Sequence, residues 1–233
     1  MMAAYSTSVR DYLTSITRHN RPGGHAFFEA LNRLPVAKLE QPEFLAQIGN
    51  LYQVTLHVLQ LAAVKVPHLT TRDRHARHTG IMAAHAAIFA NSGKLFHALS
   101  RGAVWRPEHF GSLAAMKKGL SGPVFNALTA LDDLYALSGG LGAWVLCERL
   151  LADWLAAMQA VFNRSVPGER LEPAGFSLMS DTSEAVLALT QDVVNASPQI
   201  VDGQTLRGMQ AAMECWKAIW DAQHVMIVAE DRK

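Results

Sequence analysis

The chain has 233 residues, of which 50% are hydrophobic and 18% are charged, and its formal net charge is +1. This length and composition suffice for one substantial hydrophobic core, so we expect a single domain over residues 1–233. Lysine and arginine are scattered along the chain, which argues against a nucleic-acid partner. Residues 1–19 are amphipathic and lack the apolar segment of an export signal, so we expect a cytoplasmic protein.

Prolines separate the apolar periodic segments along the whole chain, and this punctuation is typical of helical proteins. The sequence has no alternating β-branched runs joined by turn residues, which would indicate strands. The pattern therefore predicts an all-α fold, a single-domain helical bundle. Helices are expected at residues 5–19, 24–33, 42–65, 70–100, 107–118, 122–137, 139–164, 176–196 and 203–229.

Two residue pairs have the spacing of a capping box, in which side chains satisfy free N–H groups at the start of a helix. They are Thr70 with Asp73, and Asp181 with Glu184. The longest predicted loop runs over residues 165–175 and contains proline and glycine. This loop is either a lid over a site or a simple helix connection.

The helix expected at residues 42–65 carries a stripe of polar but uncharged side chains. They recur every three or four residues and are Gln47, Asn50, Gln53, His57 and Gln60. Their polarity excludes a membrane span here, and no other segment predicts one. Because solvated faces usually carry charges, the stripe indicates a partly buried cavity or a homodimer contact, with an ordinary surface as the alternative. We predict His57 as a catalytic residue and Gln53 as a substrate contact.

Two ionisable residues stand alone within long apolar segments. His85 has no titratable neighbour within residues 80–90, and Glu148 is the only acid between Asp133 and Asp153. A buried charge is costly unless it is paired, neutralised or bound to something. The sequence therefore predicts an interior site in which His85 and Glu148 are catalytic acid–base groups or metal ligands. The alternative for His85 is a core histidine bonded to one partner.

Further residues are expected at the same site. His78 lies seven residues before His85 on nearly the same helix face, which would suit a metal site, although the solvated end of the helix is the alternative. Cys147 is either a nucleophile or a packed, inert thiol. The tryptophans fill the core or line a pocket. As substrate contacts we predict Trp144, Cys147, Asp181 and Trp216, together with Gln53.

Three segments resemble the heme-oxygenase-like superfamily, which includes the TenA thiaminases, the PqqC cofactor-free oxidase and the heme-oxygenase-like di-iron oxidases. Residues 25–31 are similar to the His-Pro-Phe-Phe opening of the TenA and PqqC groups. Residues 85–89 resemble the helix that supplies a histidine ligand in the di-iron members. Residues 141–148 are similar to the Leu-Gly-x5-Glu helix, whose glutamate is also a ligand there. The resemblance implies one helical domain that acts on a small organic molecule between its helices.

The ligand pattern that this resemblance implies is incomplete in the present chain. Met82 occupies the position of the first carboxylate, and residues 179–187 lack the later histidine and aspartate ligands. We therefore expect a metal-poor or cofactor-free oxidase or oxygenase, with iron on His85 and Glu148 or with no metal at all. The alternative function on the same fold is a non-catalytic protein that binds a small molecule or a partner.

Overall fold

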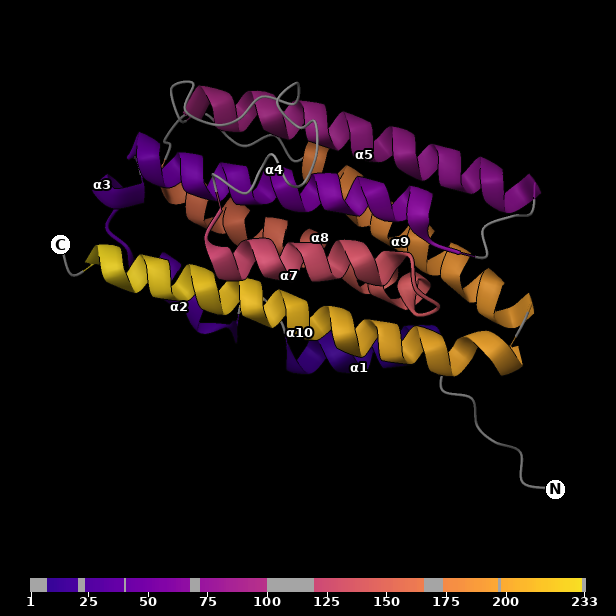
Figure 1. Ribbon diagram of the computed structural model, residues 1–233. Coiled ribbons are helices and arrows are strands. Elements are labelled where there is room, and N and C mark those ends of the chain that lie inside the picture. Colours follow the sequence, from indigo (N-terminus) through magenta and orange to yellow (C-terminus); the bar gives the residue numbers. More distant parts are fainter. Residues whose placement is uncertain are drawn as a thin grey trace.

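The computed structural model describes residues 8–20, 24–39, 41–67, 72–99, 120–165, 174–196 and 198–231. Every regular element in these residues is a helix, so the all-α prediction is confirmed (Figure 1). Within this part of the chain, no helix is long and apolar enough to cross a membrane.

The helices keep to the predicted order, with small shifts at their ends. They are α1 (Val9–His19), α2 (Ala26–Arg33), α3 (Val36–Leu39), α4 (Pro42–Lys65), α5 (Arg72–Leu99), α7 (Gly122–Tyr135), α8 (Gly140–Ser165), α9 (Ala174–Ala196) and α10 (Pro198–Asp231). The short α3 is additional to the prediction. The helix expected at 107–118 and the centre of the loop expected at 165–175 lie outside the described residues.

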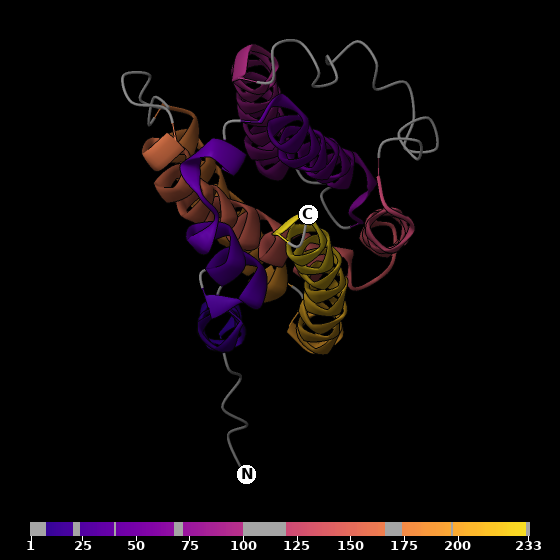
Figure 2. The same cartoon turned by 90° about the vertical axis from the view of Figure 1, so that its left-hand side faces the viewer.

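The long helices run side by side, and α8 lies in the middle of the bundle (Figure 1). It packs against α10 and α9, and also contacts α4 and α7. Figure 2 looks along the helices and shows α4 and α5 on one side of the bundle and α1, α2 and α10 on the other. All residues from Gly140 to Glu148 are buried, so the first part of α8 forms the centre of the core.

Side chains just before the first two helices fix where these helices begin. Ser8 accepts a hydrogen bond from the backbone N–H of Asp11, which caps α1. His25 caps α2, because its Nδ1 accepts the backbone N–H of Phe27 at 3.2 Å. The histidine that opens the family-like segment therefore has a local role in starting a helix.

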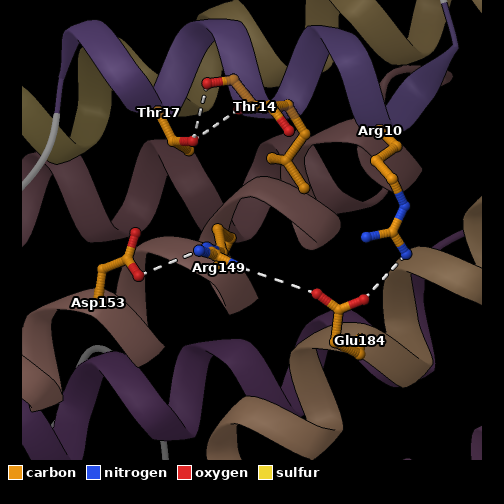
Figure 3. Close-up of polar contacts among 7 residues, drawn as sticks. Arg10, Thr14, Thr17, Arg149, Asp153 and Glu184 are labelled. Atoms are coloured by element: carbon orange, nitrogen blue, oxygen red, sulfur yellow. Dashed lines mark hydrogen bonds and ion pairs between the residues drawn. The ribbon is translucent and has the colours of Figure 1, made fainter.

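The capping box predicted at Asp181 is wrong, because α9 already begins at Ala174 and Asp181 lies inside the helix with an exposed side chain. Glu184 instead joins three helices (Figure 3). Its carboxylate lies 2.9 Å from Arg10 of α1 and 3.8 Å from Arg149 of α8. The other predicted pair begins at Thr70, which lies outside the described residues.

Glycines bring the backbones of α8 and α10 into direct contact. A Cβ atom added to Gly142 would lie 1.8 Å from the backbone oxygen of Thr205. A Cβ atom added to Gly208 would lie 1.9 Å from the oxygen of Gly139, just before α8. Only glycine fits at these positions, so the crossing of α8 over α10 is fixed by their backbones.

Candidate functional site

The interior site is built on His85 of α5 and Glu148 of α8. The Nε2 atom of His85 lies 2.6 Å from the Oε1 atom of Glu148, and both side chains are 0% exposed. Trp144 lies one helical turn before Glu148, and its Nε1–H donates a hydrogen bond of 2.8 Å to the same oxygen. The two isolated ionisable residues of the sequence are thus partners, and Trp144 holds the carboxylate in place.

This pair keeps unused hydrogen-bonding capacity. Within the described part of the chain, His85 Nδ1 and Glu148 Oε2 are buried and have no hydrogen-bond partner. The short contact between Nε2 and Oε1 is an ion-pair contact without the alignment of a hydrogen bond. Buried polar atoms are normally satisfied, so unsatisfied atoms on two neighbouring side chains call for a functional explanation.

The charges of the pair depend on each other. A lone carboxylate or a lone imidazolium at 0% exposure is strongly disfavoured, whereas a protonated His85 beside an ionised Glu148 has no net charge. Imidazole and carboxylate are also the groups that most often transfer protons in enzymes. The arrangement can therefore give or take a proton inside the core.

His78 lies on the outer side of Trp144. Its ring centroid is 6.1 Å from that of Trp144, in an edge-to-face arrangement. Its Nε2 atom is buried without a hydrogen-bond partner in the described residues. Burial, followed by the nearby His75 and His85, lowers the pKa of His78, which favours the neutral ring. His78 is therefore half-buried beside the site, although the sequence left a solvated position open.

Cys147 lies in a second cluster of polar side chains. Its neighbours differ from those of Glu148. Trp216 of α10 donates a hydrogen bond from Nε1 to Cys147 Sγ at 3.2 Å, and Tyr135 of α7 is also hydrogen-bonded to the sulfur. Burial raises the pKa of Cys147 to about 12, although these two hydrogen bonds act in the opposite direction. The thiol form is thus strongly favoured, which supports the interpretation of Cys147 as a packed side chain rather than a nucleophile.

Tyr135 is a member of this group that the sequence analysis missed. Burial raises its pKa well above 10, so the phenol keeps its proton and can donate it in a hydrogen bond. A buried tyrosine hydroxyl needs a partner, and this requirement was the only signal in the sequence. That signal does not identify the partner as Cys147.

The remaining predicted residues lie in different surroundings. His57 of α4 is half-buried, and burial lowers its pKa, while Asp132 and a hydrogen bond with Gln60 raise it. Asp181 is exposed on α9. Gln53 belongs to α4, but its side chain lies outside the described part of the structure. The structure therefore joins His85, Glu148 and Trp144 directly, and separately joins Cys147 with Trp216.

The family resemblance implies iron in some members, with histidine and glutamate side chains as ligands. Among the described residues, no three or more His, Cys, Asp or Glu side chains gather closely enough to hold a metal ion. His85 and Glu148 offer two ligands, whereas a mononuclear iron site of the facial-triad type uses three. The described residues do not form such a site on their own, and we derive no step through a metal.

Comparison with known proteins adds no relative from which a function could be carried over. No family model matches the sequence, and no curated protein or solved structure matches it either.

Proposed function

We propose that this protein is an oxidase or oxygenase of a small organic molecule, in which the buried pair of His85 and Glu148 transfers protons. The observation that carries the proposal is the combination of complete burial with unused polar atoms. A histidine and a glutamate at 0% exposure contact each other, and His85 Nδ1 and Glu148 Oε2 still have no hydrogen-bond partner among the described residues. A purely structural pair would normally satisfy these atoms.

The roles within the pair follow from these contacts. Glu148 is held by the Trp144 indole and lies against His85 Nε2, so its carboxylate favours an imidazole that carries its proton on Nε2. In that tautomer Nδ1 has a free lone pair and acts as the general base. When Nδ1 has taken a proton, the imidazolium is stabilised by the adjacent carboxylate.

The proposed reaction needs no group beyond the substrate and dioxygen. His85 Nδ1 removes a proton from the substrate, and the electron pair of the broken bond stays on the substrate as an anion. The anion then gives two electrons to dioxygen and loses a second proton. Dioxygen takes up this proton and the proton that His85 returns. The products are the oxidised substrate and hydrogen peroxide.

The experiment uses variants that block turnover and retain the bound molecule. Small molecules would be extracted from purified Glu148→Gln protein and identified by mass spectrometry, and then added to wild-type protein in air-saturated buffer. We expect oxygen consumption and hydrogen peroxide from wild type, with rates lower by about 100-fold or more in His85→Gln and Glu148→Gln. His75→Gln, an exposed histidine on the same helix, is the matched control and should react like wild type.

Three results would decide against this reaction. Wild-type rates in both variants would show that the pair is not the reacting group. A molecule that is retained by every variant but never consumed would favour the non-catalytic binding protein. Iron measured by plasma mass spectrometry in untagged protein, and lost in His85→Gln, would replace the metal-free reaction with a metal-dependent one.

We also propose a cytoplasmic location and a small organic molecule as the partner. A net charge of +1 with scattered lysine and arginine argues against nucleic acid. The homodimer through the stripe on α4 is a weaker proposal. Asn50 is buried and His57 is half-buried within the single chain, which favours an interior position for this part of the stripe. Size-exclusion chromatography of Gln53→Lys with His57→Glu tests the dimer, because an interface there would dissociate.

A further inference from the structure

A hollow lies on the outside of the bundle, between the end of α1, the start of α2 and the outer face of α10. Its volume is about 450 Å³, enough for a small molecule, and we call it the α1–α10 pocket. None of its lining residues belongs to α5 or α8, so it is separate from the His85 and Glu148 pair. Its polar lining consists mainly of Arg18, His19, His25, Lys217, Trp220 and Asp221.

Local contacts hold two groups of this wall. Asn20 donates from its side chain to the oxygen of Ile16 at 2.8 Å and from its backbone to the oxygen of Thr17, which covers the end of α1. His25 accepts the N–H of Phe27 on Nδ1, so its proton is on Nε2, which lies 3.2 Å from Asp221. His25 Nδ1 is therefore not available to a ligand as an acceptor, whereas the Asp221 carboxylate, at 74% exposure, is.

The hydrogen-bond donors of the pocket have fewer partners. Arg18 makes no ion pair or hydrogen bond within the described part of the chain. Trp220 is 2% exposed, and its indole N–H is buried without a hydrogen-bond partner there. Among the described residues, Lys217 pairs with Glu214 of the same helix, at 3.1 Å and in an exposed position. A buried unsatisfied donor in a pocket wall needs an acceptor, which a bound molecule can supply.

We infer that the α1–α10 pocket binds a small organic anion. Its carboxylate or phosphate group would accept hydrogen bonds from Arg18 and Trp220 Nε1, and Lys217 would add a second positive charge. Arginine suits this role because its planar guanidinium matches the oxygen atoms of both acid groups. The carboxylate of Asp221 opposes the anion, and its contact with His25 Nε2 reduces this repulsion. The inference does not depend on the proposed oxidase reaction.

The test is a titration of the full-length protein with phenyl phosphate and with benzoate, followed by the indole N–H signals in a proton–nitrogen NMR spectrum. Trp220→Phe identifies the signal of Trp220. We expect this signal to shift in a saturable way with one or both acids and to stay in place with benzyl alcohol, which has the ring but no charge. The two acids distinguish a phosphate site from a carboxylate site.

Charge substitutions test the inference, because it predicts opposite changes in affinity for the loss of a positive and of a negative side chain. Arg18→Gln should weaken binding by about 10-fold or more, whereas Asp221→Asn should strengthen it, because it removes the opposing charge and keeps the shape. Arg33→Gln is the control, since Arg33 is an exposed arginine of α2 outside this pocket. A Trp220 signal that does not saturate with either acid would overturn the inference. So would equal effects of Arg18→Gln and Arg33→Gln, which would indicate a general attraction of anions to the surface.

Discussion

Glu148 and Arg149 are neighbours in α8, yet they belong to two different electrostatic regions. Glu148 is 0% exposed, and its carboxylate contacts the imidazole of His85 at 2.6 Å. The Arg149 side chain is 43% exposed and contacts Asp153 at 3.4 Å and Glu184 at 3.8 Å (Figure 3). Successive helix residues point about 100° apart, so one step along α8 leads from the centre of the core to the surface.

The difference teaches that an ion pair has no fixed energetic value. Removing one partner of a buried pair costs about 3–5 kcal/mol, because the other group stays in the core without compensation. An exposed pair contributes only about 0.2–1 kcal/mol, because water solvates either group after the other is removed. We therefore expect the interior pair to control folding and chemistry, and the surface group to adjust the packing of α1, α8 and α9.

The largest loss of stability is expected from Glu148→Ala in the core. It leaves His85 buried without its partner and should lower the free energy of unfolding by about 3–5 kcal/mol, measured by urea denaturation and circular dichroism. A loss below about 1 kcal/mol would show that the buried pair behaves like a surface pair.

A double variant serves as the matched control for this measurement. His85→Leu combined with Glu148→Met removes both charges and roughly keeps the volume, so it should be close to wild type in stability. It should nevertheless lose the activity or ligand of the interior site. A double variant that is as unstable as Glu148→Ala would mean that packing, rather than charge, explains the loss.

The next effect concerns Cys147, the residue before Glu148, which sharpens the contrast between core and surface. Because burial raises its pKa to about 12, almost no thiolate exists at pH 8.5. Iodoacetamide should modify Cys147 at least about 100-fold more slowly in the native protein than in urea, as measured by peptide mass spectrometry. Comparable rates in both conditions would contradict the buried, protonated thiol.

The same pKa predicts a dependence of stability on pH. The unfolded thiol loses its proton near its ordinary pKa of 9.0, whereas the folded thiol keeps it up to about 12. The unfolded state therefore binds fewer protons in this range, and stability should fall as pH rises from 9 towards 12. Cys147→Ala should remove part of this decrease.

The smallest effect is expected from Glu184→Ala on the surface. This change removes the carboxylate that Arg10 and Arg149 share. We expect the free energy of unfolding to fall by about 0.2–1 kcal/mol, and by less in 1 M salt. The measurement is the same urea denaturation at low and high salt. A loss as large as that of Glu148→Ala would erase the distinction between the two regions.

The sequence predicted most of the helices because prolines and apolar periodicity mark their ends. The short α3 escaped prediction, since four residues after Pro35 are too few for a periodic pattern. The last helix begins at Pro198 rather than at 203, because proline fits the first turn of a helix. The capping box predicted for Asp181 and Glu184 was wrong for another reason. The same spacing also occurs on the outer face of a helix.

For the site, the sequence identified which residues need partners but could not identify the partners. The apolar flanks of His85 and Glu148 predicted that both are buried, and both are 0% exposed. Their contact depends on how α5 lies over α8, which no local pattern encodes. The same holds for Trp216 and Tyr135 at Cys147, which come from two other helices.

The glycine contacts between α8 and α10 also have a consequence for protein engineering. Replacing glycine by alanine within helices is a common route to higher thermal stability, because it restricts the unfolded chain. At Gly142 and Gly208 this rule reverses, since the new methyl group would lie within 2 Å of a backbone oxygen. Gly80 in α5 has no atom within 4 Å of the corresponding position and is suited to this replacement. A stabilised form of the protein should therefore be sought along α5, and the α8 to α10 crossing should be left unchanged.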